Sequence, residues 1–137
     1  MQKNFELELN QLDILIKYLK EIINEDCIVI LRGDLASGKT TLVKNYVKAL
    51  GLTDLVTSPT FSLQAIYSDN IFHYDVYNKT LGEFISLGML EEFEKKGVHF
   101  VEWGDEKLEE ILNDYGYKVI LIEIEKKDNK RLYKINA

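Results

Sequence analysis

Cysteine and long apolar runs are nearly absent from this sequence, which argues against a secreted or membrane-spanning protein. The single cysteine, Cys27, cannot form an intramolecular disulfide and lies in an apolar stretch, as expected of a buried thiol in a reducing compartment. No apolar run approaches the ~18 residues of a transmembrane helix, and residues 1–10 lack the apolar centre of a signal peptide. We therefore expect a cytoplasmic protein that does not contact membranes.

Positive charge is also scarce. The chain has 17 basic and 23 acidic residues, a formal net charge of −6, and its only arginines are Arg32 and Arg131. A surface of this charge repels nucleic-acid phosphates, so contact with RNA is expected only through a partner protein or a local basic patch. With 137 residues the chain can bury one core without disulfides, and we expect a single domain over residues 1–137.

A glycine-rich motif is the most informative feature that the sequence does contain. Residues 33–40 read G-x-x-x-x-G-K-T, between an apolar, strand-like run (27–31) and an amphipathic, helix-like run (41–50). In such a phosphate-binding loop the backbone N–H groups face phosphate oxygens, Lys39 reaches the outer phosphates as an exposed loop residue, and the Thr40 hydroxyl can ligate Mg²⁺. The structural alternative is a glycine-rich turn that binds nothing.

The rest of the pattern predicts an α/β fold. Alternation indicates a first strand through Phe5, Leu7 and Leu9, and Asn10 with Asp13 is expected to cap the helix that follows. The further predicted elements are a β-hairpin of residues 61–67 and 71–76, a helix over 81–93 weakened by Gly82 and Gly88, a strand over 98–101, a helix over 105–112, and strands over 119–124 and 132–135. We expect a mostly parallel sheet with an added antiparallel hairpin and helices on both faces, as in phosphate-loop NTPases.

Two acidic residues in strand-like runs are candidates for metal binding and catalysis. Glu102 follows the apolar run 98–101, and Asp75 lies in the run 71–76. Acidic residues are depleted in strands, and phosphate-loop enzymes use a carboxylate near the loop to hold the metal. The alternatives are an exposed charge at a strand end for Glu102 and a solvent-facing hairpin residue for Asp75.

Five motifs extend the phosphate loop into a pattern that covers nearly the whole chain. They are G-D-L-x-x-G-K-T-T-L-V at 33–43, V-T-S-P-T-F at 56–61, H-Y-D-V-Y at 73–77, L-G at 87–88 and V-E-W-G-D at 101–105. In this order they resemble the bacterial TsaE (YjeE) family. The resemblance implies a small Mg²⁺-dependent ATPase that hydrolyses ATP slowly and acts with TsaD and TsaB in the threonylcarbamoyl modification of adenosine 37 in tRNA. It implies contact with tRNA only indirectly, through that complex.

The resemblance also assigns roles to residues. Lys39, Asp75 and Glu102 are the implied catalytic residues, Thr40 and Glu102 hold Mg²⁺, and Asp75 orients the attacking water or the outer shell of the metal. Residues 57–61 resemble a switch segment near the γ-phosphate. His73, on the same strand face as Asp75, is expected either to act directly or to be half-buried with a backbone partner. The residues implied to contact the nucleotide are Leu35, Ala36, Ser37, Gly38, Lys39, Thr40, Thr41, Asp75, Trp103 and Arg131.

Some of these assignments have structural alternatives. Trp103 could be a core or rim aromatic, and Arg131 a solvated charge at a strand end. The family usually has Gly-Ala where this chain has Ala36-Ser37, so Ala36 must keep a negative φ or accept strain.

Two other functions remain open from the sequence. A small-molecule kinase would transfer the γ-phosphate to a metabolite and would need a lid with arginines, which the scarcity of arginine disfavours. A nucleotide-gated interaction module without turnover would use Asp75 and Glu102 only to tune affinity.

Overall fold

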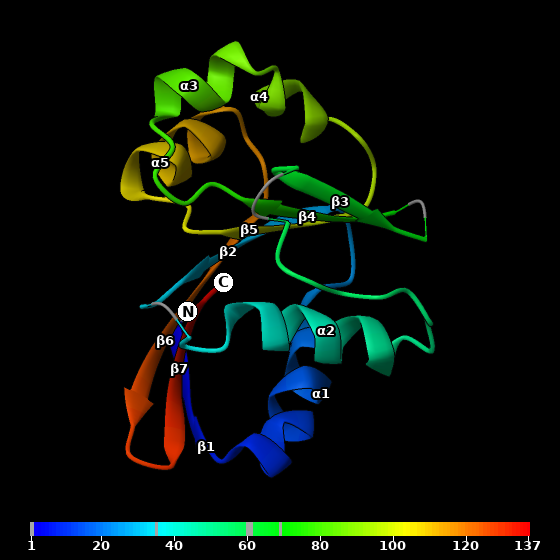
Figure 1. The fold of residues 1–137 in the computed structure, drawn as a ribbon, viewed down its shortest axis with the longest axis vertical. Coiled ribbons are helices and arrows are strands. Elements are labelled where there is room, and N and C mark those ends of the chain that lie inside the picture. Colours follow the sequence, from blue (N-terminus) through cyan, green and yellow to red (C-terminus); the bar gives the residue numbers. More distant parts are fainter. Residues whose placement is uncertain (1, 35, 60–61, 69) are drawn as a thin grey trace.

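A mixed seven-stranded sheet lies at the centre of the described residues, which in this computed structural model are 2–34, 36–59, 62–68 and 70–137. Its strand order is β1-β7-β6-β2-β5-β4-β3, with parallel pairs in the centre and antiparallel pairs toward both edges (Figure 1). The strands are β1 (Gln2–Leu7), β2 (Cys27–Arg32), β3 (Gln64–Tyr67), β4 (Ile71–Asp75), β5 (Val98–Glu102), β6 (Val119–Lys127) and β7 (Lys130–Asn136). The predicted α/β class, with a parallel centre and the added hairpin β3–β4, is confirmed.

Helices cover both faces of the sheet (Figure 1). They are α1 (Leu12–Ile22) and α2 (Lys39–Ala49) on one face, and α3 (Leu81–Ser86), α4 (Met89–Glu92) and α5 (Glu106–Asp114) on the other. Because successive strand residues point to opposite faces, β2 contributes to both cores. Val29 and Leu31 pack in the core under α1 and α2, whereas Ile28 and Ile30 pack in the core under α3 to α5. This double burial explains why residues 27–31 are all apolar.

The N-terminal prediction was wrong in two details. Leu9 does not continue the first strand: it is 72% exposed and lies in the 3₁₀ helix η1 (Leu9–Gln11). Asn10 is also not the cap: Gln11 is the N-cap of α1, and Glu8 is that of η1, where the backbone N–H of Glu8 donates to Gln11 Oε1 at 2.9 Å. The chain leaves β1 at Leu7 and uses this short turn to enter α1, so Asp13 falls inside the first turn of α1.

The predicted helix over 81–93 is divided at Gly88, which adopts a φ of 76° between α3 and α4. Glycine adopts this left-handed conformation readily because it has no Cβ to clash, and it therefore commonly ends a helix. The predicted helix at 105–112 begins one residue later, because Asp105 is its cap and accepts from the Leu108 N–H at 2.9 Å. Both boundaries follow local capping chemistry.

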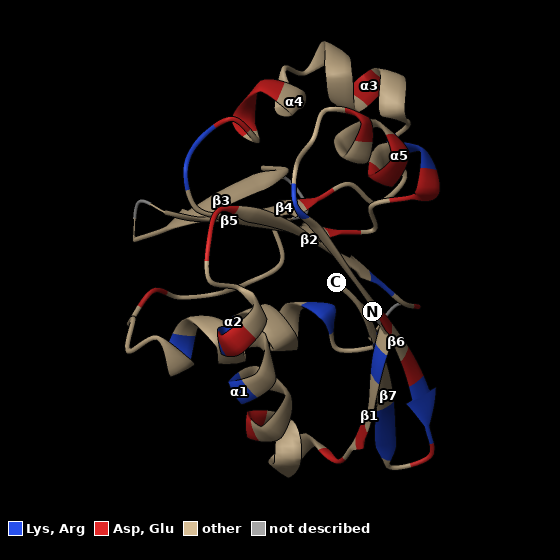
Figure 2. Ribbon diagram, turned by 180° about the vertical axis from the view of Figure 1, so that it is seen from behind, with Lys and Arg blue, Asp and Glu red and all other residues tan. Residues whose placement is uncertain are grey.

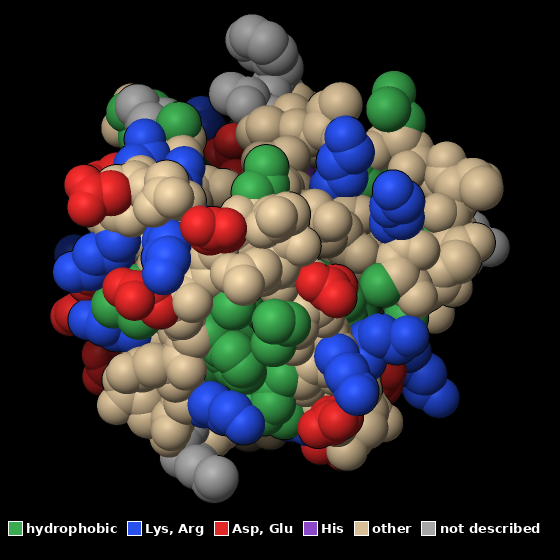
Figure 3. All heavy atoms as spheres, turned by 90° about the horizontal axis from the view of Figure 1, so that it is seen from below, with side chains coloured by type: hydrophobic (Ala, Val, Ile, Leu, Met, Phe, Trp, Pro, Cys, Tyr) green, Lys and Arg blue, Asp and Glu red, His purple; other side chains and the backbone are tan. Residues whose placement is uncertain are grey.

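Charged residues of both signs are spread over the surface. On hairpin β6–β7, where basic residues gather (Figure 2), Glu125 accepts from Lys134 at 3.1 Å and lies 3.8 Å from Lys127. The exposed Leu9 and Ile14 belong to η1 and α1, and hydrophobic side chains lie among basic ones on the face seen from below (Figure 3). None of the described helices has the length and hydropathy needed to cross a membrane.

Candidate functional site

The glycine-rich loop connects β2 to α2, as the motif predicts. A Cβ on Gly33 would lie 2.6 Å from Ser37 Oγ and 2.7 Å from the Ile124 carbonyl oxygen, so only glycine fits there without rearrangement. Gly38 precedes α2 with a φ of 108°, a conformation that glycine adopts at little cost. The helix therefore begins at Lys39, and its N-terminus faces the loop. Leu35 lies outside the described residues.

Lys39 is buried, contrary to the expectation of an exposed loop lysine. Only 5% of the residue is exposed. Its ammonium donates to the carbonyl oxygens of Gly33 at 2.7 Å and Asp34 at 3.0 Å, and it lies 3.9 Å from the ring centroid of Trp103. Burial lowers the pKa of the Lys39 ammonium, and the nearby Glu102 and Asp75 carboxylates oppose this shift. The positive charge is thus held inside the curl of the loop.

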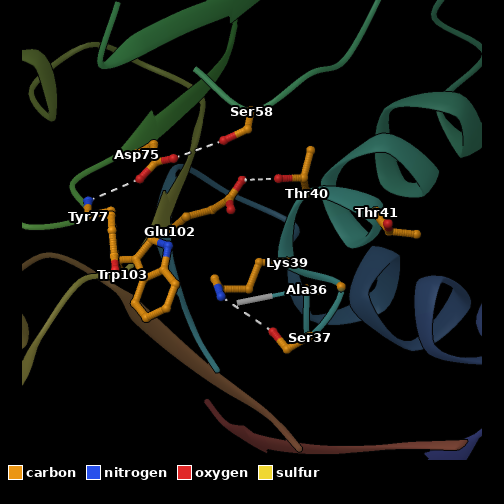
Figure 4. A pocket seen from close by; sticks show the side chains of 11 residues that line it. Ala36, Ser37, Lys39, Thr40, Thr41, Ser58, Asp75, Tyr77, Glu102 and Trp103 are labelled. Atoms are coloured by element: carbon orange, nitrogen blue, oxygen red, sulfur yellow. Dashed lines mark hydrogen bonds between the residues drawn. The ribbon is translucent and has the colours of Figure 1, made fainter. Parts of the chain in front are cut away.

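Asp75 and Glu102 end two neighbouring parallel strands in the same register. They are 5% and 3% exposed, which excludes the two solvent-facing alternatives. Thr40 Oγ1 donates to Glu102 Oε2 at 2.7 Å (Figure 4). Asp75 accepts from Ser58 Oγ at 2.9 Å and from the Tyr77 N–H at 3.0 Å. Both carboxylates therefore lie beside the start of α2.

His73 is fully buried and bonded through both ring nitrogens. Nε2 lies 2.5 Å from Glu102 Oε2, and Nδ1 lies 2.9 Å from the Tyr67 hydroxyl. The half-buried alternative with a backbone partner was therefore wrong. Sequence reasoning missed the role of Tyr67, although the predicted hairpin places this residue on the strand that pairs with β4.

A cavity of about 570 Å³ brings most of the predicted site residues together (Figure 4). Its lining consists of Ala36, Ser37, Gly38, Lys39, Thr40, Thr41, Ser58, Asp75, Tyr77, Glu102 and Trp103. The Trp103 ring lies at its edge, 4.7 Å from that of Tyr77 between centroids. Arg131 is not in this lining; its Nε donates to the Ser37 carbonyl oxygen at 3.1 Å from β7. Thr60 and Phe61 of the expected switch segment lie outside the described residues.

Ala36 adopts a φ of 59°, so it accepts strain rather than keeping a negative φ. This left-handed conformation costs a residue with a Cβ roughly 1–2 kcal/mol. We expect Ala36→Gly to raise the free energy of unfolding by about 1 kcal/mol, since glycine removes the strain but is more flexible when unfolded. Urea denaturation measures the change.

The matched control is Ala49→Gly, which makes the same chemical change at the last residue of α2. There we expect a loss of up to about 1 kcal/mol, because glycine is a poorer helix former than alanine. Equal destabilisation by both substitutions would contradict strain at Ala36.

The centre of the sheet is parallel, and its strand β2 leads through a glycine-rich loop into helix α2. Carboxylates lie at the ends of the neighbouring strands β4 and β5. This arrangement is the fold of phosphate-loop NTPases. The solved structures support this class: a crystal structure of YdiB from Bacillus subtilis superposes with a TM-score of 0.70 and 26% identity, covering 100% of this chain and 86% of that one.

The chain belongs to the TsaE family. The family model described as "Threonylcarbamoyl adenosine biosynthesis protein TsaE" matches residues 8–133. The chain is 38% identical over 93 residues to the tRNA threonylcarbamoyladenosine biosynthesis protein TsaE of Treponema pallidum, covering 66% of this chain and 69% of the relative. It is 42% identical over 79 residues to that of Bacillus subtilis, covering 56% of this chain and 49% of the relative. The aligned part is therefore about half the length of the Bacillus protein. The family is one of tRNA threonylcarbamoyladenosine biosynthesis, as the motifs predicted.

Proposed function

We propose that this chain binds ATP with Mg²⁺, hydrolyses it slowly, and acts with TsaD and TsaB in the threonylcarbamoyl modification of tRNA, meeting the tRNA only through that complex. The observation that carries the proposal is the convergence of the loop lysine, Thr40 and two buried carboxylates on one cavity. The family supports the pathway, and the chemistry of the cavity supports the nucleotide.

The loop suits a chain of phosphates. Its backbone and the N-terminus of α2 supply N–H groups and the positive end of a helix dipole. The Lys39 ammonium is bound to two neutral carbonyl oxygens, and charged phosphate oxygens are stronger acceptors for it. A bound triphosphate would therefore draw the ammonium away from Gly33 and Asp34.

The donor set suits Mg²⁺. Thr40 Oγ1 and Glu102 Oε2 are hard oxygen ligands 2.7 Å apart, close to the roughly 3 Å between adjacent ligands of an octahedral Mg²⁺ ion. Mg²⁺ is commonly held by one or two protein oxygens together with substrate phosphates and water. When bound, the ion would neutralise charge on the outer phosphates. Thr40 and Glu102 are the residues that would hold it.

Slow hydrolysis fits the positions of the charged groups. Asp75 offers a buried carboxylate near the loop, which can accept a hydrogen bond from an attacking water. Arginines that stabilise the transition state are worth roughly 10³–10⁵ in rate, and neither of the two arginines here lines the cavity. Arg32 donates to the Gly104 carbonyl oxygen and to Glu109, and Arg131 to the Ser37 carbonyl oxygen. The same engagement disfavours a kinase with an arginine-bearing lid.

The proposal predicts that the nucleotide controls partner binding. Ser58 touches both the cavity and Asp75, and the nearby Leu55 is 84% exposed, so a change at the phosphates can reach the surface through this segment. We expect the chain to join a TsaB–TsaD complex about tenfold more tightly with ATP than with ADP, which needs about 1.4 kcal/mol of coupling. Calorimetry with each nucleotide measures the difference.

Phosphate release by the purified chain, with and without TsaB and TsaD, tests the hydrolysis step. Equal partner affinities with ATP, ADP and no nucleotide would contradict nucleotide control. Unequal affinities without phosphate release would instead identify a nucleotide-gated interaction module.

A further inference from the structure

A chain of buried polar contacts runs from Thr40 to the backbone of Thr57. Thr40 Oγ1 donates to Glu102 Oε2 at 2.7 Å, and the same carboxylate oxygen lies 2.5 Å from His73 Nε2. His73 Nδ1 lies 2.9 Å from the Tyr67 hydroxyl, which is also 3.4 Å from the Thr57 carbonyl oxygen. Tyr67, His73 and Glu102 are 4%, 0% and 3% exposed, so water competes little for these contacts.

Proton counting on a neutral His73 selects one arrangement of this chain. A carboxylate oxygen is an acceptor, so His73 Nε2 must carry a proton to bond Glu102. In the neutral imidazole Nδ1 is then an acceptor, and the Tyr67 hydroxyl must donate to it. Burial raises the pKa of Tyr67 to about 12, so this hydroxyl keeps its proton at neutral pH. The Thr57 carbonyl oxygen is left with the longer, weaker contact.

We infer that His73 and Tyr67 are positioning residues for Glu102. The Glu102 carboxylate selects the Nε2–H tautomer of His73, the Tyr67 hydroxyl holds the ring by donating to Nδ1, and the Nε2–H of His73 holds the Glu102 carboxylate against Thr40. This inference rests on the proposed function, because it gives the pair a role in holding the Mg²⁺ ligand. Hydrogen-bonded partners of this kind orient metal-ligating carboxylates in many proteins.

The geometry also ties Glu102 to the segment before Pro59. The Tyr67 hydroxyl has one proton and two acceptors within reach, His73 Nδ1 and the Thr57 carbonyl oxygen. A movement of Thr57 toward Tyr67 would draw that proton away from His73 Nδ1 and loosen the hold of Tyr67 on the ring. The orientation of Glu102 therefore depends on the position of a segment that is distant in sequence.

The tautomer can be measured in the free chain, without nucleotide or activity. In long-range proton–nitrogen NMR spectra of the nitrogen-15-labelled protein we expect His73 to carry its proton on Nε2. In Tyr67→Phe we expect the proton to stay on Nε2, because Glu102 still accepts it, and the Nδ1 resonance to shift because that nitrogen has lost its donor. His99 is an internal control, because its Nε2 lies 2.8 Å from the Lys95 carbonyl oxygen, and its spectrum should not change. A proton on Nδ1 of His73 in the parent chain, alone or with one on Nε2, would overturn the inference.

The second measurement is the Mg²⁺ requirement for ATP binding. It is the Mg²⁺ concentration at which calorimetry shows half of the Mg²⁺-dependent increase in ATP binding. His73→Asn leaves an amide too short to reach Glu102 and should raise that concentration at least about tenfold. His73→Gln carries the same group one bond further and should restore it to within about threefold. Tyr67→Phe should raise it about fivefold, the effect of one net hydrogen bond. Binding of ATP in EDTA should be equal in all variants, which a damaged fold would not allow.

The matched control is Tyr46→Phe. Tyr46 is as buried as Tyr67 and lies in the same core, and its hydroxyl makes no hydrogen bond with another described residue. Its Mg²⁺ requirement should equal that of the parent chain. An unchanged requirement in His73→Asn would overturn the positioning role alone, whereas a parent chain that binds no ATP would overturn this inference together with the proposed function.

Discussion

Lys39→Ala is expected to lower ATP affinity at least about a hundredfold. The ammonium now bonded to the Gly33 and Asp34 carbonyl oxygens is the group that the loop can present to the outer phosphates. Two charge-assisted hydrogen bonds to phosphate, each worth roughly 1.5–3 kcal/mol, account for a loss of this size. Calorimetric titration with Mg·ATP measures it.

The same substitution is expected to leave the fold intact. Lys39 is buried, but its partners are the carbonyl oxygens of the half-buried Gly33 and the exposed Asp34, where water can replace the ammonium. We expect the free energy of unfolding to change by less than about 2 kcal/mol. Lys44→Ala removes an exposed lysine from the same helix and should change neither property. Unaltered ATP affinity in Lys39→Ala would refute a phosphate-binding role for the loop.

Much of the site could be predicted because strand order and motif spacing determine where backbone ends meet. Glu102 follows an apolar run and Asp75 ends an alternating run, and parallel pairing of β4 with β5 brings them into register beside the loop. Gly33 and Gly38 were expected because the loop needs close approach and a positive φ. These features depend on the backbone, which the hydrophobic pattern largely determines.

Features that depend on side-chain rotamers could not be predicted. The burial of Lys39 under the Trp103 ring depends on how two side chains turn toward each other across the cavity. The contact of His73 with Glu102 joins residues 29 positions apart, and no local pattern reports it. The cap at Glu8 was missed for a different reason: several polar residues near position 10 can start a helix, and the pairing of β1 with β7 ends at Leu7, which selects among them.

Asp75→Asn is expected to slow ATP turnover at least about a hundredfold while ATP affinity stays within about threefold of the parent value. A positioned acid or base contributes typically 10²–10⁴ in rate, and asparagine removes the charge while keeping the shape. The amide oxygen can still accept from the Tyr77 N–H, and the Ser58 hydroxyl can rotate to accept from the amide nitrogen. The segment at Ser58 should therefore stay in place. Phosphate release at saturating Mg·ATP measures the turnover.

Two comparisons separate this role from a general loss of charge. Asp54→Asn makes the same change at a carboxylate that bonds Ser68 outside the cavity, and should leave turnover unchanged. Glu102→Gln should act mainly on Mg²⁺-dependent binding, because the Thr40 hydroxyl donates to Glu102. We therefore expect Glu102→Gln to raise the Mg²⁺ requirement and Asp75→Asn to lower turnover, although the two carboxylates are adjacent in the sheet. Full activity in both variants would return Asp75 and Glu102 to structural roles, and equal losses in both assays would mean that the two act as one unit.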